Sequence, residues 1–292
     1  MQSAPPYLTR ACLLPGLLLS ALLLLGACSS LDPATRQAQA DHLASQHGWT
    51  RTSLTTPTFT LAAYTPRSSA QVNTLTVYIE GDGLAWINVS TPSLDPTPRD
   101  PLALKLALRD QSGQAVYLAR PCQFVQANEQ RHCEPRYWTS HRFAPEVVDA
   151  TSIAIDQLKQ KSRAAQIRLV GYSGGGAIAA LVAAQRNDVI ALITVAGNLD
   201  HATWTSMHRI TPLHGSLNAI NVTARLQPIP QHHYVGEKDE IISSAIARVY
   251  LNRFSAPRPQ LTVVPGFDHH CCWESIWPSL VEKNFDLPNV TK

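Results

Sequence analysis

The chain has 292 residues, of which 45% are hydrophobic and 15% charged, and its net charge is +3. This length and hydrophobic content suffice for one large domain with a substantial core. The absence of a basic run or an acidic tail from the sequence argues against nucleic acid as a partner, and 21 prolines with 14 glycines argue against a helical bundle.

The first 27 residues have the pattern of an export signal. Arg10 supplies a positive charge, and the apolar stretch 13–25 is shorter than the ~20 residues of a comfortable membrane span. It ends in Leu-Gly-Ala-Cys at 25–28, which resembles the lipobox of bacterial lipoproteins. The resemblance implies a signal peptide over 1–27 and acyl chains on Cys28 that hold the mature chain in a bilayer. Ser29, where an aspartate would retain the protein in the inner membrane, favours the outer membrane, facing the periplasm. The alternative is an ordinary secretory signal with an incidental cysteine.

Residues 28–47 are polar and rich in Ala and Gln, so they are predicted to be a tether before a domain over 48–292. Taken in chain order, the predicted strands are 58–64, 75–79, 115–119, 167–170, 189–196, 232–235 and 261–264. The predicted helices are 102–109, 145–161, 177–185, 241–252 and 273–284. Residues 90–101, with four prolines, and 123–143 are expected to be irregular.

This alternation of strands and helices predicts an α/β fold with a mostly parallel sheet covered by helices on both faces. Active sites in such sheets lie at the carboxyl ends of the strands. A glycine-rich turn follows 75–79, a second turn follows 167–170, Asp239 follows 232–235, and two histidines follow 261–264. All four features are therefore expected at one edge of the sheet.

The sequence Gly-Tyr-Ser-Gly-Gly at 171–175 contains Gly-x-Ser-x-Gly, with Ser173 in the middle. An apolar strand leads into it and a small-residue helix leads out, which is the context of a nucleophile elbow. Glycine is expected at both flanking positions because larger side chains would collide with the strand and the helix. The alternative is a glycine-rich turn before a buried helix.

The order serine, acid, histidine over residues 75–292 resembles the α/β-hydrolase family, and the resemblance implies that fold with Ser173 as nucleophile. Gly-Phe-Asp-His at 266–269 is similar to the family's Gly-x-x-His loop and implies His269 as the base, with His270 as the competitor. Gly-Glu-Lys-Asp at 236–239 looks like the family's Gly-x-x-Asp and implies Asp239 as the acid. Asp239 could also cap the following helix, and Asp200 is the alternative acid.

The resemblance also implies an oxyanion hole. The N–H of Gly174, the residue after the nucleophile, is one expected donor. The second is expected in Glu80-Gly81-Asp82-Gly83, where the Asp82 N–H fits the family position and Gly83 is the alternative. Relatives often carry histidine where this chain has Glu80. An acidic side chain there would disfavour an anionic transition state unless it points away or is hydrogen-bonded.

Export to an oxidising compartment would leave four cysteines available for disulfides. Cys122 and Cys133 would close a short loop and are the preferred pair. Cys271 and Cys272 would then form a strained vicinal disulfide or remain thiols. Adjacent histidines and cysteines surround a metal ion poorly, so neither a metal nor another cofactor is expected.

These features favour a serine hydrolase that cleaves a carboxylic ester or thioester through an acyl-enzyme. Its expected partners are a small acyl-ester substrate and the lipid bilayer, and the protein is expected to be a monomer. An acyltransferase or a peptidase could use the same residues, and a non-catalytic lipoprotein scaffold or binding module is the alternative from another class. Residues 197–231 form a possible small cap whose apolar side chains line a pocket or cover the sheet: Trp204, Met207, Leu213, Leu217 and Ile220.

Overall fold

The computed structural model describes residues 32–68 and 71–285. The predicted signal peptide and Cys28 lie outside these residues. Within the described ranges, no helix combines the length and the apolar character that crossing a membrane requires.

The centre of the molecule is one eight-stranded sheet with the order β1-β2-β4-β3-β5-β6-β7-β8. β2 runs antiparallel to β1 and β4, and the other neighbouring strands are parallel. The strands are β1 Trp49–Thr55, β2 Thr60–Pro66, β3 Thr74–Ile79, β4 Ala115–Leu118, β5 Gln166–Tyr172, β6 Val189–Val195, β7 Gln231–Gly236 and β8 Gln260–Val264. The carboxyl ends of β3 to β8 therefore share one edge, as the sequence predicted.

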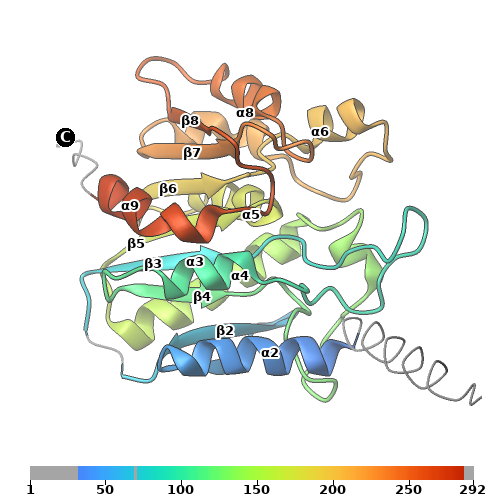
Figure 1. Ribbon diagram of the computed structural model, residues 1–292, viewed down its shortest axis with the longest axis vertical. Helices are drawn as coiled ribbons and strands as arrows, with labels where there is room; N and C mark the ends of the chain where they lie inside the picture. The colour runs from blue at the N-terminus through green and yellow to red at the C-terminus, as the bar shows by residue number, and fades with distance from the viewer. Residues whose placement is uncertain (1–31, 69–70, 286–292) are drawn as a thin grey trace, which may run out of the picture.

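Helices cover both faces of the sheet, and each face has its own core. On one face α2 (Pro33–Gln46), α3 (Leu102–Leu108) and α9 (Trp273–Phe285) pack against Tyr78, Tyr117 and their neighbours, in front of the sheet in Figure 1. On the other face α4 (Pro145–Ser162) and α5 (Gly174–Ala183) pack against Leu75, Val77 and Ile79, and α8 (Ser244–Leu251) packs against β7 in the same core. This opposition follows from the alternation of side chains along a strand.

The segment predicted as a tether contains helix α2, which is part of the domain. Asp32 caps the helix by accepting from the Thr35 N–H, with proline at the first helical position. Ala40 and Ala44 are buried against the sheet. Arg36 is only 3% exposed, and its guanidinium donates to the Thr97 carbonyl and pairs with Asp95 at 3.4 Å. Residues 33–46 therefore belong to the fold.

Residues 197–231, the possible cap, form α6 (His201–His208), the 3-10 helix η2 (Ala219–Val222) and α7 (Thr223–Leu226). Another 3-10 helix, η1 (Pro135–Trp138), interrupts the irregular stretch after β4. Leu213 and Ile220 of the cap segment join the core, whereas Met207 is half-exposed. Leu213 and Ile220 thus help to cover the sheet, and Leu213 and Leu217 also line a cavity.

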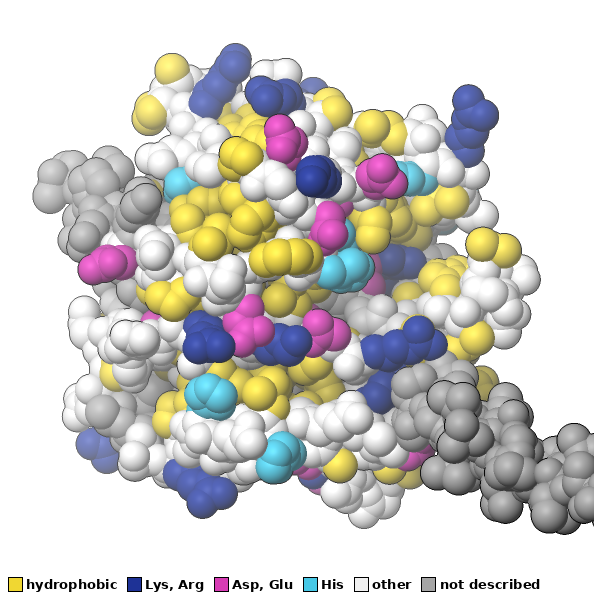
Figure 2. Space-filling model, in the orientation of Figure 1, with side chains coloured by type: hydrophobic (Ala, Val, Ile, Leu, Met, Phe, Trp, Pro, Cys, Tyr) yellow, Lys and Arg dark blue, Asp and Glu magenta, His cyan; other side chains and the backbone are white. Residues whose placement is uncertain are grey.

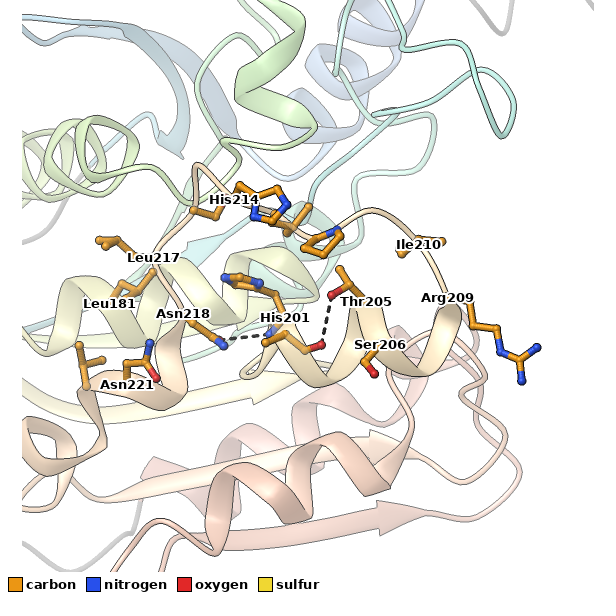
Figure 3. A pocket seen from close by; sticks show the side chains of 15 residues that line it. Leu181, His201, Thr205, Ser206, Arg209, Ile210, His214, Leu217, Asn218 and Asn221 are labelled. Carbon is orange, nitrogen blue, oxygen red and sulfur yellow. Dashed lines mark hydrogen bonds between the residues drawn. The ribbon is translucent and has the colours of Figure 1, made fainter.

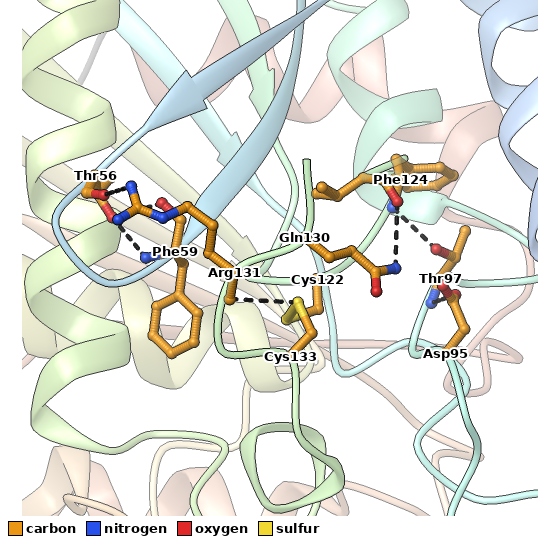
Figure 4. The surroundings of a disulfide bond; sticks show 10 residues. Thr56, Phe59, Asp95, Thr97, Cys122, Phe124, Gln130, Arg131 and Cys133 are labelled. Atoms are coloured by element: carbon orange, nitrogen blue, oxygen red, sulfur yellow. Dashed lines mark hydrogen bonds between the residues drawn. A yellow bond between two sulfur atoms is a disulfide. The ribbon is translucent and has the colours of Figure 1, made fainter. Parts of the chain in front are cut away.

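A disulfide joins Cys122 to Cys133, with the two Cα atoms 5.7 Å apart, as predicted. Figure 4 shows it next to Arg131, with Thr56 and Phe59 of the turn between β1 and β2 on its left. Arg131 Nη1 donates to the Thr56 carbonyl at 3.0 Å. The structure also pairs Cys271 with Cys272, which is the vicinal alternative of the two considered.

Candidate active site

Ser173 sits in the sharp turn between β5 and α5, with φ 52° and ψ −120°. A left-handed backbone at a non-glycine residue is strained, and it persists only where the surroundings fix it. Here close packing of two glycines fixes it. A Cβ on Gly171 would lie 2.4 Å from the Gly175 carbonyl oxygen, and a Cβ on Gly175 would lie 2.3 Å from the Ile79 carbonyl oxygen. The turn is therefore wedged between its own helix and the end of β3.

The structure brings Ser173, His269 and Asp239 together in one hydrogen-bonded chain. His269 Nε2 is 3.0 Å from Ser173 Oγ, and His269 Nδ1 is 2.9 Å from Asp239 Oδ2. The Asp239 side chain is fully buried and that of His269 is 7% exposed. The other oxygen of Asp239 accepts from the N–H groups of Ile241 and Ile242, at 2.9 and 2.7 Å. Asp239 thus contacts His269 and also caps the turn at Ile241 and Ile242, but it does not cap the helix as expected, because α8 begins only at Ser244, after the N-cap Ser243.

The alternative base, His270, and the alternative acid, Asp200, are not part of this hydrogen-bonded chain. The His270 ring contacts the Tyr172 hydroxyl at 3.0 Å, and no contact joins it to Ser173. Asp200 caps α6 and accepts from Thr203 and Asn218. Burial alone would raise the pKa of Asp200, but these hydrogen bonds hold it below its ordinary value. In this arrangement Asp200 stabilises the start of α6.

The turn after β3 packs closely against the turn that carries Ser173. A Cβ on Gly81 would lie 3.3 Å from Ser173 Cβ, and a Cβ on Gly174 would lie 2.1 Å from Asp82 Oδ1. The Asp82 carboxylate therefore lies directly over the backbone of Gly174. Gly174 is the first residue of α5, where the backbone N–H has no carbonyl partner within the helix.

Two arginines neutralise the Asp82 carboxylate. Arg142 Nη1 is 2.6 Å from Asp82 Oδ2, and Arg120 Nη1 is 3.3 Å from Asp82 Oδ1. Arg120 also donates through Nη2 to the Arg142 carbonyl. Burial lowers the pKa of Arg120 to about 10, so this guanidinium is still charged at neutral pH. The three groups carry a formal charge of +1 beside the elbow.

Glu80 points away from the site, into the core. It is 1% exposed, and its Oε1 accepts from the Gly81 N–H at 2.9 Å. Burial raises the pKa of Glu80 to about 7, against an ordinary value of 4.5. Glu80 is thus turned away from the expected oxyanion region, whereas the Asp82 carboxylate stays beside Gly174 and its charge is offset by the two arginines.

Gln123 and the neighbouring disulfide hold this turn in place. Gln123 is fully buried, its Nε2 donates to the Gly81 carbonyl at 3.0 Å, and its Oε1 accepts from the Arg120 N–H. Cys122, between Arg120 and Gln123, is bonded to Cys133. The roles of Arg120, Arg142 and Gln123 were not predicted from the sequence. One signal could have indicated Arg120: it follows the end of β4, which is the parallel neighbour of β3, so it lies at the same edge of the sheet as the turn that carries Asp82.

A cavity of about 720 Å³ lies under the cap segment, between α6 and α5. Its lining includes Leu181, His201, Thr205, Leu213 and Leu217 but not Ser173. Figure 3 shows the His201 ring at the middle of this cavity, beside Thr205 and Asn218. The cap segment therefore encloses space next to the elbow helix rather than over the serine.

Among the residues that the structure describes, no group of His, Cys, Asp or Glu side chains is arranged to hold a metal ion. His232 and His233 lie in β7, where the sequence predicted a strand. His233 is fully buried, and burial lowers its pKa to about 3. It contacts Thr194 within the sheet.

Comparison with solved structures shows that this is the α/β-hydrolase fold. The α/β hydrolase GrgF from Penicillium sp. sh18 superposes with a TM-score of 0.59 at 15% identity, covering 82% of this chain and 96% of that one. An alpha-beta serine hydrolase homologue from Coxiella burnetii gives 0.54 at 16% identity, covering 80% and 94%. A membrane phospholipase A, described as a bacterial virulence factor, gives 0.51 at 15% identity, covering 92% and 96%. No family model matches the sequence, and neither does any curated protein.

Proposed function

We propose that this protein is a serine hydrolase that cleaves a carboxylic ester or thioester, with Ser173 as nucleophile, His269 as base and Asp239 as acid. The observation that carries the proposal is the continuous hydrogen-bonded chain from Asp239 through His269 to Ser173, at 2.9 and 3.0 Å. A serine hydroxyl needs a neutral imidazole to accept its proton, and the imidazole needs an acceptor that fixes its tautomer. The compared structures include serine hydrolases and a phospholipase, in keeping with such a substrate.

In the proposed reaction His269 carries its proton on Nδ1 and donates it to the Asp239 carboxylate in a hydrogen bond. Nε2 accepts the Ser173 proton as Oγ attacks the carbonyl carbon and the carbonyl electrons move to oxygen. When the tetrahedral adduct collapses, the bond to the leaving group breaks, and the alcohol or thiol departs with the proton from Nε2. Water, activated by the same nitrogen, then hydrolyses the acyl-Ser173 ester.

The negative oxygen of this adduct requires N–H donors that are already in place. The proposed donors are the backbone N–H groups of Gly174 and Asp82, with Gly83 as the alternative to Asp82. The net positive charge of Asp82, Arg120 and Arg142 supports this assignment, because it favours an anion in their vicinity.

We propose also that the protein is exported and anchored by acyl chains on Cys28, in the outer membrane and facing the periplasm. The lipobox-like sequence at residues 25–28 supports this proposal. Cys28→Ala is expected to release the protein from the membrane fraction. Persistent membrane association of this variant would contradict the anchor.

The function is tested by treating the protein with a fluorophosphonate probe and measuring its intact mass. The probe reacts with a serine that a base and an oxyanion hole activate. We expect one adduct on the wild type and none on Ser173→Ala, with turnover of a short-chain ester falling by several orders of magnitude while folding is retained.

The neighbouring histidines provide a matched pair of variants. His269→Ala is expected to abolish labelling, whereas His270→Ala retains it, because only His269 contacts Ser173. Labelling of Ser173→Ala, or equal labelling of the two histidine variants, would refute the assignment. No labelling of the wild type would favour the non-catalytic binding module.

A further inference from the structure

Residues 84–97 form a projecting loop, here called the finger, directly after the turn that carries Asp82. Four large apolar side chains of the finger are exposed: Trp86 by 42%, Ile87 by 44%, Leu94 by 93% and Val89 completely. No charged residue occurs between Gly83 and Leu94. Exposed apolar patches on soluble domains mark surfaces that meet another apolar phase or partner.

Several backbone N–H groups of the finger form hydrogen bonds within it. The N–H groups of Leu84, Ile87 and Ser93 donate to carbonyls within the finger, at 2.9 to 3.0 Å. Asn88 Oδ1 accepts from the N–H groups of Ser90 and Thr91. A loop whose N–H groups are paired in this way can leave water at lower cost than one with open donors.

Further exposed apolar residues follow other strands at the same edge of the sheet. Met207 and Ile210, at the end of α6, are 50% and 45% exposed, and Ile241, two residues after Asp239, is 41% exposed. His208 Nε2 contacts the Ile241 carbonyl at 2.9 Å, which joins these two segments. The finger and α6 project from the same side in Figure 1, and Figure 2 shows hydrophobic side chains, in yellow, along that side.

The start of the described chain is attached to the base of the finger. Arg36, in the first turn of α2, donates to the Thr97 carbonyl and pairs with Asp95. Cys28 precedes Asp32 by four residues, a span of at most about 14 Å. Acyl chains on Cys28 would therefore enter the bilayer close to the finger.

We propose that the finger, with Met207, Ile210 and Ile241, docks onto the lipid bilayer, so that the serine edge of the sheet faces the membrane. The substrate would then be an acyl ester of an amphiphile that resides in the bilayer. This inference rests on the proposed hydrolase and its lipid anchor. The apolar side chains of the finger, the lack of charge over its residues 84–94 and its proximity to the anchor favour a lipid surface over a protein partner.

Docking is tested on the full-length protein, purified from membranes and reconstituted into phosphatidylcholine vesicles. A fluorophore on Val89→Cys is expected to be quenched by nitroxide-bearing lipid, whereas one on Val249→Cys, an exposed valine of α8, is not. The protein without an introduced cysteine gives the background from Cys271 and Cys272. Equal access of an aqueous quencher to positions 89 and 249 would overturn the proposal. Position 89 could instead be shielded from the aqueous quencher in the absence of vesicles, and more strongly at higher protein concentration. This result would show that the finger contacts a second copy of the protein, and it would also overturn the proposal.

A second measurement compares hydrolysis of a long-chain ester carried in vesicles with that of a soluble short-chain ester. Removing one buried apolar side chain lowers partition into lipid about tenfold, so the ratio of the two rates is expected to fall at least about tenfold in the double variant Ile87→Ser, Val89→Ser. Val249→Ser is expected to keep the wild-type ratio. An unchanged ratio in the double variant would contradict docking. If no ester is hydrolysed, the proposed function fails, whereas the quenching measurement, which needs no catalysis, still decides the docking.

Discussion

Replacing Glu80 with glutamine is expected to change the pH dependence of stability in a defined direction. Glu80 is fully buried beside the turn that carries Asp82, and burial raises its pKa from 4.5 to about 7. Below pH 4.5 the side chain is protonated in both the folded and the unfolded chain. Between pH 4.5 and 7 the unfolded chain releases this proton while the folded chain retains it. The free energy of unfolding therefore falls as the pH rises through this window.

The size of the effect follows from the two pKa values. Each pKa unit corresponds to 1.36 kcal/mol, so the interval from 4.5 to about 7 amounts to about 3 kcal/mol. The glutamine side chain cannot ionise and resembles protonated glutamic acid in shape. The stability of Glu80→Gln relative to the wild type is thus expected to increase by about 3 kcal/mol from pH 4 to pH 8.

The measurement is urea unfolding of both proteins at several pH values across this range. Contributions of other titrating groups cancel in the difference between variant and wild type. Glu282→Gln, at an exposed position of α9, controls for the loss of one negative charge. A difference between Glu80→Gln and the wild type that stays constant from pH 4 to pH 8, or that moves in the opposite direction, would refute the reasoning.

Three further predictions concern the site and its support. Asp239→Asn is expected to lower kcat by about 10⁴-fold because it disturbs the tautomer of the base, whereas Asp200→Asn retains activity; equal losses in an ester assay would argue against this assignment. Gly175→Ala places a Cβ 2.3 Å from the Ile79 carbonyl oxygen at the end of β3, so it is expected to lower the free energy of unfolding by about 3 kcal/mol. A urea midpoint equal to that of the wild type would contradict the close packing of Gly175 against β3. The double variant Cys122→Ser, Cys133→Ser opens a loop with a sequence separation of 11 and is expected to lose about 3 kcal/mol; the same stability under non-reducing conditions would show that the bond does not form in solution.

Much of the fold could be predicted because its central elements carry strong local patterns. The apolar run before Ser173 and the small residues after it allowed β5, the turn at Ser173 and α5 to be predicted. The proximity of Ser173, Asp239 and His269 followed from their places after parallel strands, whose carboxyl ends share one edge. Sequence could not orient the two adjacent histidines, because the choice depends on Tyr172, which holds the His270 ring away from the serine.

The elements that were missed lack a large apolar face. β1 is an edge strand paired only with β2, and its threonines, serine and arginine leave little alternation to detect, since only Trp49 and Leu54 are buried. The buried stripe of α2 consists of alanines and an arginine, so its composition resembles that of a linker.

The charged cluster at the site could not be predicted for a different reason. Asp82 lies 38 positions from Arg120 and 60 from Arg142, and only the tertiary fold brings the three together. The acidic residue Glu80 beside the expected oxyanion region raised a conflict in the sequence that only the burial and direction of its side chain in the fold resolve.

The integration of α2 into the domain limits how the protein could be shed by proteolysis. Cutting within residues 33–46 would remove the partner of the buried Asp95 or the Asp41 carboxylate that accepts from the Tyr64 hydroxyl at 2.7 Å. It would also uncover the face of the sheet against which Ala40 and Ala44 pack. A released form that stays folded must therefore keep the whole of α2, so only the few residues between Cys28 and Asp32 would be left for a protease that separates the domain from the proposed lipid anchor.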